Sequence, residues 1–120
     1  MYEYKIANIR VVDGDTVDCD IDLGFDQWMH KQRIRLTGID APEIRTKNLE
    51  EKKLGLDAKQ WLNEMLDTEV RLRCDEYNAR GKFGRILGSL MIEISDGEWL
   101  NVNQAMIEEG HARYYDGGKR

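Results

Sequence analysis

The stretch from Thr16 to Leu23 alternates strictly between apolar and polar residues, and no other feature constrains the fold of this chain as strongly. This is the period of a β-strand with one face in a hydrophobic core. The apolar members share one face: Val17, Cys19, Ile21 and Leu23. The other face carries Asp18, Asp20 and Asp22, which we expect to be solvated and screened by water.

Related patterns predict the remaining elements. The predicted strands are Tyr4–Val12, Thr16–Leu23, Arg33–Ile39, Val70–Cys74 and Ile86–Ile94. Apolar residues at helical spacing predict a helix over Leu49–Leu66, and Asn101 is expected to cap a second helix that ends at Gly110. The predicted fold class is α+β, mainly β: a small five-stranded barrel with two helices. The same pattern also fits a two-layer sandwich.

Length and composition favour one domain over residues 1–120, with a mobile tail over 113–120. Because the chain has no apolar stretch of membrane-spanning length and no signal peptide, we expect it to be cytoplasmic. Cys19 and Cys74 lie far apart within apolar patterns, which indicates two buried free thiols.

Charge is unevenly distributed along the chain. The formal net charge of -5 argues against broad electrostatic binding of nucleic acid. An acidic block from Asp13 to Asp26 is nevertheless followed by seven basic residues between Lys31 and Lys53. Carboxylates beside cationic groups suit a metal ion with an anionic substrate, although composition alone favours an ordinary solvated surface.

Four sequence blocks, in order, resemble the staphylococcal nuclease (thermonuclease) family. They are DGDT (13–16), RIRLTGIDAPE (33–43), GKFGR (81–85) and NVNQAMIEEGHA (101–112). The resemblance extends from about Ile9 to Ala112. It implies a barrel of the oligonucleotide-binding type, a calcium ion, and hydrolysis of phosphodiester bonds in DNA or RNA, with single strands as the preferred substrate.

The resemblance assigns the metal carboxylates to Asp15 and Asp40, with the backbone carbonyl of Ala41 as a further ligand. Calcium is a hard cation that takes several oxygen ligands, and manganese and magnesium also bind carboxylates. Asp13 and Gly14 are expected to form the turn before Asp15. A calcium-binding protein without hydrolase activity is a poor alternative, since an EF-hand loop fails at Val17 or, in a later register, at Leu23.

The resemblance also assigns three catalytic residues. Glu43 matches the residue that orients and deprotonates the attacking water, and Arg35 and Arg85 match the arginines that hold the scissile phosphate. A planar guanidinium can donate two parallel hydrogen bonds to phosphate oxygens and oppose charge that develops in the transition state. The implied chemistry is in-line attack of water on phosphorus, with the 5′ oxygen leaving and a 3′-phosphate product. A catalytically silent nucleic-acid-binding module is the main alternative.

The chain departs from the family pattern in two places. Phe83 replaces a frequent tyrosine and lacks its hydroxyl group, and the sequence ends eight residues after Ala112, without the helix that usually follows there. The surface left uncovered predicts weak homodimerisation. Candidates for base stacking are Tyr77, Tyr114 and Tyr115, each of which can equally be a packing residue. His30, expected in a loop, and His111 lack metal-ligand spacing and are expected to be structural or exposed.

Overall fold

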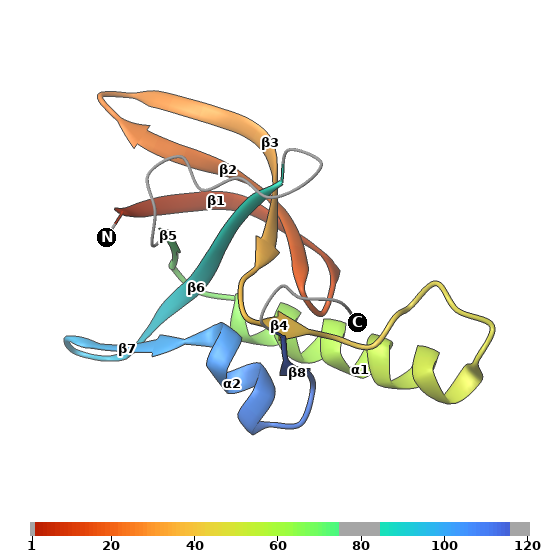
Figure 1. Ribbon diagram of the computed structural model, residues 1–120. Helices are drawn as coiled ribbons and strands as arrows, with labels where there is room; N and C mark the ends of the chain where they lie inside the picture. Colours follow the sequence, from red (N-terminus) through yellow and green to blue (C-terminus); the bar gives the residue numbers. More distant parts are fainter. Residues whose placement is uncertain (1, 75–84, 116–120) are drawn as a thin grey trace.

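A β-barrel with two helices at one end makes up the part of the chain that this computed structural model describes, residues 2–74 and 85–115 (Figure 1). The helices are α1 (Leu49–Met65) and α2 (Val102–Glu108). The strands are β1 (Tyr2–Asp13), β2 (Thr16–Gly24), β3 (Gln27–Leu36), β4 (Ile39–Asp40), β5 (Val70–Cys74), β6 (Ile86–Ser95), β7 (Glu98–Asn101) and β8 (Arg113–Tyr114).

The main sheet closes on itself. Its strand order is β3-β2-β1-β5-β6-β7, and an additional pairing joins β3 to β6. That pairing is parallel and aligns Ile34 with Ile86, whereas the other neighbours are antiparallel. Five strands therefore form the barrel, and β7 extends the sheet beyond β6. The closure confirms the predicted barrel with two helices and excludes the two-layer sandwich.

The β2–β3 hairpin differs from the prediction. The third strand begins at Gln27 instead of Arg33, so His30 lies within a strand and not in a loop. Phe25 and Asp26 form the two-residue turn, with φ values of 55° and 61°. Both values lie in the left-handed region, which suits the right-handed twist of the two strands but is uncommon for residues other than glycine.

The core fills the barrel and continues beneath the two helices. Its fully buried members include Val17 of β2, Ile34 of β3, Leu62 of α1 and Met106 of α2. Cys19 and Cys74 are buried free thiols, as predicted. Burial, with a smaller effect of nearby aspartates, raises the pKa of Cys19 to about 12, so this thiol stays protonated at neutral pH.

Asparagine side chains fix both helices. Asn48 caps α1 by accepting hydrogen bonds from the N–H groups of Glu50 and Glu51, and Asn101 caps α2 as predicted. Asn103, which is 3% exposed, joins α2 to the barrel. It accepts from the Leu90 N–H and donates to the carbonyls of Thr37 and Gly88. None of the described helices is long and apolar enough to cross a membrane.

The strand β7 was not expected. It provides only four residues, EWLN, too few to show an alternating pattern. Arg113 and Tyr114, at the start of the predicted tail, form β8 by pairing with Asp40 and Ile39 of β4. Residues 116–120, the rest of that predicted tail, lie outside the described part of the chain.

Candidate functional site

The turn between β1 and β2 delivers Asp15 to the end of the barrel that faces the helices. The Asp15 N–H donates to Asp13 Oδ1 at 3.0 Å, which closes the turn expected at Asp13 and Gly14. A Cβ atom on Gly14 would lie 2.7 Å from the Ala41 Cβ and 2.9 Å from the Ala58 Cβ. Glycine therefore allows the turn to pack directly against Ala41, which follows Asp40 in sequence.

The Asp15 carboxylate is held by protein donors. Thr16 Oγ1 donates to Oδ1 at 3.0 Å, and the Ala41 N–H donates to Oδ2 at 2.9 Å. Burial raises the pKa of Asp15 to about 6; the hydrogen bond and negative charge of Asp13 act in the same direction, whereas Ala41 and Arg35 oppose it. The site therefore keeps a carboxylate in surroundings that disfavour its charge.

Arg35 lies between the two aspartates. It is on β3, directly opposite Thr16. Its Nη2 atom is 3.6 Å from Asp15 Oδ2 and 3.7 Å from Asp40 Oδ1, and its Nη1 donates to the Leu36 carbonyl at 2.9 Å. All three side chains are largely buried: Arg35 is 9% exposed, Asp15 is 12% exposed and Asp40 is 7% exposed. The fold thus brings together three of the residues assigned from the sequence.

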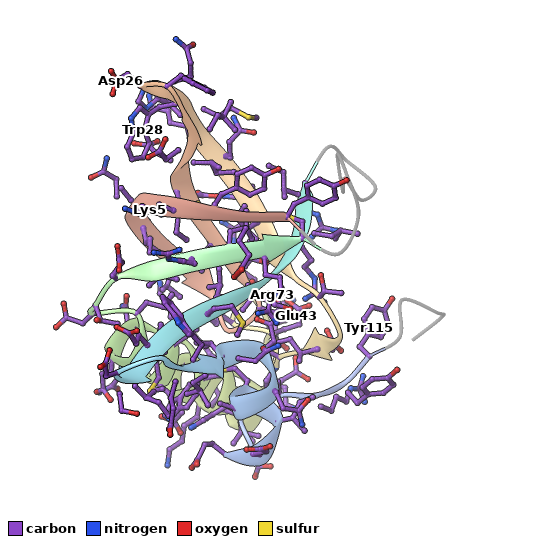
Figure 2. The ribbon with its side chains drawn as sticks, turned by 90° about the vertical axis from the view of Figure 1, so that its left-hand side faces the viewer. Lys5, Asp26, Trp28, Glu43, Arg73 and Tyr115 are labelled. Carbon is purple, nitrogen blue, oxygen red and sulfur yellow. The ribbon has the colours of Figure 1, made fainter. Side chains whose placement is uncertain are left out.

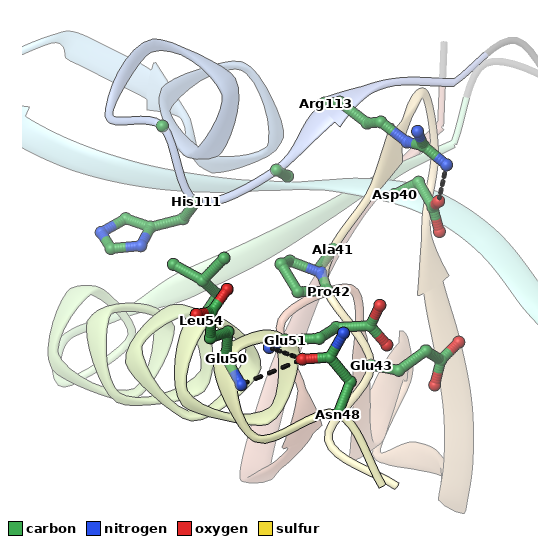
Figure 3. Close-up of a pocket in the computed structure, with 12 residues that line it drawn as sticks. Asp40, Ala41, Pro42, Glu43, Asn48, Glu50, Glu51, Leu54, His111 and Arg113 are labelled. Atoms are coloured by element: carbon green, nitrogen blue, oxygen red, sulfur yellow. Dashed lines mark hydrogen bonds and ion pairs between the residues drawn. The ribbon is translucent and has the colours of Figure 1, made fainter. Parts of the chain in front are cut away.

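Asp40 and Glu43 line a groove of about 650 Å³ beside this cluster (Figure 3). The groove lies between the segment that follows β4, the first turns of α1, and residues 110–113. Glu43 is exposed at its rim. Gly55 of α1 sets the position of this segment, because a Cβ there would be 2.8 Å from the Pro42 carbonyl oxygen and 2.9 Å from that of Glu43.

Arg85 immediately precedes β6, next to the strand that carries Arg35. Leu87 pairs with Arg35 across the β3–β6 ladder. Because side chains alternate along a strand, Arg85 belongs to the same outer face as Leu87 and Arg35. The rest of the GKFGR block, which includes Phe83, lies outside the described part of the chain, as does Tyr77.

The donors around Arg35 suit a hard divalent cation. Asp15 and Asp40 each place a carboxylate oxygen within 3.7 Å of the same Arg35 nitrogen, and carboxylate oxygens are ligands that such cations prefer. In residues 2–74 and 85–115, no three His, Cys, Asp or Glu side chains gather closely enough to hold a metal ion. A metal here would therefore need other ligands as well, and the Ala41 carbonyl and water are suitable in kind.

Arg113 is a site residue that the sequence analysis missed. Its Nη2 atom lies 3.3 Å from Asp40 Oδ2. Tyr115, a predicted stacking candidate, has its ring centroid 6.0 Å from the Arg35 Cζ atom. Tyr114 is 72% exposed. No local pattern signals the Arg113 contact, because it depends on the pairing of two strands of two residues each.

The outer face of β2 is exposed to solvent and also forms ion pairs. Asp18 accepts from Arg33 and Arg10, and Asp20 accepts from Asn8 and the Lys31 N–H. Hydrogen bonds from Asn8 and Lys31 lower the pKa of Asp20 to about 2. Direct partners thus stabilise these aspartates, where the sequence analysis relied on screening by water. His30 is exposed beside Asp20. Figure 2 shows that the hairpin tip, marked by Asp26 and Trp28, lies far from Glu43 and therefore from the candidate site.

His111 lines the groove and is half-buried, in keeping with the structural role expected for it. Its ring packs against Trp61, with 5.4 Å between the ring centroids.

Comparison with known proteins gives a consistent set of relatives. Residues 33–120 match the family described as staphylococcal nuclease homologue. The chain is 31% identical to a thermonuclease of Staphylococcus hyicus over 92% of its own length and 57% of the relative. It is 33% identical to a thermonuclease of Staphylococcus intermedius (88% and 58%) and 32% identical to Protein ParB of Escherichia coli (89% and 55%). The chain thus spans little more than half the length of these relatives.

Proposed function

Since the chain belongs to the staphylococcal nuclease family, we propose that it is a calcium-dependent nuclease that hydrolyses phosphodiester bonds in single-stranded DNA or RNA. One observation carries this proposal. Asp15, Arg35 and Asp40 come from three separate segments, yet both carboxylates lie within 3.7 Å of the same Arg35 nitrogen. Removing three charged groups from water costs free energy, and buried charged clusters of this kind are common at functional sites.

Arg35 binds the scissile phosphate in this proposal. Its guanidinium is fixed by the Leu36 carbonyl and by both aspartates, so little reorganisation is needed when charge develops on the phosphate oxygens. Arg85 approaches the same phosphate from the start of β6. Two planar guanidinium groups can donate paired hydrogen bonds that lysine cannot reproduce.

Glu43 orients the attacking water and accepts its proton. Its place at the groove rim, three residues after Asp40, allows water to reach it. Its backbone is held by the close approach to Gly55. A fixed carboxylate confines the direction of attack on phosphorus, as an in-line displacement requires. The family resemblance further implies that the 5′ oxygen leaves and that the product carries a 3′-phosphate.

Asp15 and Asp40, with the Ala41 carbonyl, would hold the calcium ion. When bound, the ion supplies positive charge that polarises a phosphate oxygen and helps to activate water. The protein contributes the oxygen donors and their burial, which limits competition from bulk water.

A single strand is the substrate that best fits the access to Arg35. Only 9% of this side chain is exposed, so the scissile phosphate must approach closely. An unpaired strand can bend toward the site, whereas a duplex keeps its backbone on a stiff rod.

The test is digestion of single-stranded DNA with and without calcium, followed by analysis of the product ends. Glu43→Gln and Arg35→Lys are each expected to lower kcat by about 10²- to 10³-fold with the fold retained. Matched controls are Glu50→Gln, on the same groove, and Arg33→Lys, on the same strand but bound to Asp18. Both controls should cleave like the wild type.

Two results would overturn the nuclease assignment. One is an absence of calcium-dependent cleavage by the wild type, and the other is full activity in both Glu43→Gln and Arg35→Lys. Binding of single-stranded DNA without cleavage would instead support the silent nucleic-acid-binding module.

A further inference from the structure

Residues 113–115 cover the Asp40 side of the site. β4 pairs with β8, whereas the described strands of the main sheet do not include β4. Asp40 is directly opposite Arg113 in this pair, and the Tyr115 N–H donates to the Gly38 carbonyl at 2.9 Å. The backbone of the Asp40 segment is therefore tied to residues that follow α2.

The two oxygens of Asp40 face different arginines. Oδ1 is 3.7 Å from Arg35. Oδ2 is 3.3 Å from Arg113, and Figure 3 shows this contact. The arginines differ in their surroundings, because the side chain of Arg35 is 9% exposed and that of Arg113 is 73% exposed. Arg113 thus brings a solvated positive charge to a carboxylate that is 7% exposed.

We propose that Arg113 competes with the metal ion for Asp40 and so sets the metal affinity of the site. This inference rests on the proposed function, since it concerns the same cation position. Arg113 pairs with Asp40 Oδ2, and its positive charge would oppose a cation held by the same carboxylate. The Asp40 backbone is paired with β8.

Two effects of removing Arg113 oppose each other, and their sizes decide the outcome. Loss of the hydrogen bond leaves the Asp40 carboxylate less ordered, which weakens metal binding. This effect is small, because an ion pair with an exposed arginine restrains its partner only weakly. Burial of Asp40 limits its movement in any case. Loss of a unit charge a few ångströms from a divalent ion has the larger effect, because the repulsion scales with both charges. Removal of Arg113 therefore strengthens metal binding.

The experiment measures calcium affinity by calorimetry on the full chain, without nucleic acid and at physiological ionic strength. Arg113→Gln is expected to bind calcium roughly tenfold more tightly than the wild type. Arg113→Lys keeps the charge and should stay within about twofold of the wild type. Arg10→Gln is the matched control, because Arg10 is 71% exposed and ion-paired with Asp18 on the outer barrel face. It should leave the affinity unchanged, because the charge of Arg10 is exposed, paired with Asp18 and screened by salt.

The outcomes separate this inference from the proposed function. If wild-type protein binds calcium and Arg113→Gln binds it equally or more weakly, the competition is refuted while the metal site stands. The inference also fails if Arg113→Lys tightens binding as much as Arg113→Gln, since charge would then not be the cause. If the wild type and every variant fail to bind calcium, the proposed metal site itself is wrong.

Discussion

The substitution Gly55→Ala tests how the fold positions Glu43. Glycine in a helix is unfavourable, so helix propensity alone predicts that alanine would stabilise α1 by about 1 kcal/mol. The structure predicts the opposite. The added Cβ would lie 2.8 Å and 2.9 Å from the carbonyl oxygens of Pro42 and Glu43, and 3.0 Å from Ile44 Cγ1.

These contacts cannot be relieved by a side-chain rotation, because two of them are to backbone atoms. Forcing extra volume into a packed site commonly costs about 1–3 kcal/mol. Set against the helix gain, the expected net loss is about 1 kcal/mol, or about 4 °C in the melting temperature of a domain of this size. The backbone of Pro42 and Glu43 must also move outward. A displacement near 1 Å at a catalytic group can cost about 10²-fold in rate.

Thermal unfolding and steady-state cleavage of single-stranded DNA, measured on the same preparations, provide the assay. Gly55→Ala should melt lower and show kcat reduced by about 10- to 100-fold. The control is Asn63→Ala at an exposed position of the same helix; it should gain roughly 0.5 kcal/mol from helix propensity and keep its activity. A Gly55→Ala variant that is more stable than the wild type and fully active would refute the reasoning.

Four further outcomes are expected. Asn103→Ala should lower the free energy of unfolding in urea by about 2–4 kcal/mol, because buried backbone groups lose their partner, and a loss below about 1 kcal/mol would contradict this. Asp20 has a folded-state pKa of about 2, below its unfolded value of 3.8. Its stabilising effect is thus present above about pH 4 and is lost as the pH falls toward 2. The stability deficit of Asp20→Asn should shrink over that window in acid-unfolding curves, and a constant deficit would speak against the assigned partners. Cys19, with a pKa of about 12, should resist thiol reagents at pH 7 until the chain unfolds, so rapid native labelling would be inconsistent with its burial. Leu49 and Leu56 are 79% and 46% exposed and seven residues apart on α1, which supports the expected weak self-association; light scattering should show the mass rise with concentration, and a constant monomer mass would exclude it.

Residues in the barrel wall could be predicted because a strand with one buried face has an apolar residue at every second position. Val17 and Ile21 face the core and alternate with polar neighbours, so this part of β2 is readable from local pattern alone. Leu23, predicted on the same face, is 46% exposed because it lies near the hairpin tip, beyond the core. The first half of β3 is not readable in this way. Gln27, Trp28 and His30 are exposed or half-exposed on a hairpin that extends beyond the core, so no alternation marks them as a strand.

The site was accessible from sequence to different degrees. Asp13 and Gly14 predict a turn from the local sequence, but only the family resemblance linked Asp15 to Asp40. The physical link is the ladder that sets Thr16 opposite Arg35, together with the Ala41 N–H bond to Asp15. Arg113 was missed because its contact with Asp40 spans 73 residues. Such long-range pairs arise from closure of the fold and leave no local pattern.

The proposed nuclease activity requires an acidic chain to bind a polyanion, and the charge balance of the site accounts for how this would occur. The proposed groups comprise three carboxylates and three guanidiniums: Asp15, Asp40, Glu43, Arg35, Arg85 and Arg113. Without a cation these charges cancel, and the rest of the chain, at a formal net charge of -5, repels phosphate. A bound divalent cation would give the site an excess positive charge at the place where the scissile phosphate is proposed to lie. Calcium should therefore strengthen the binding of single-stranded DNA as well as permit cleavage. With Glu43→Gln, which separates binding from turnover, equal affinity for the strand with and without calcium would contradict this reasoning.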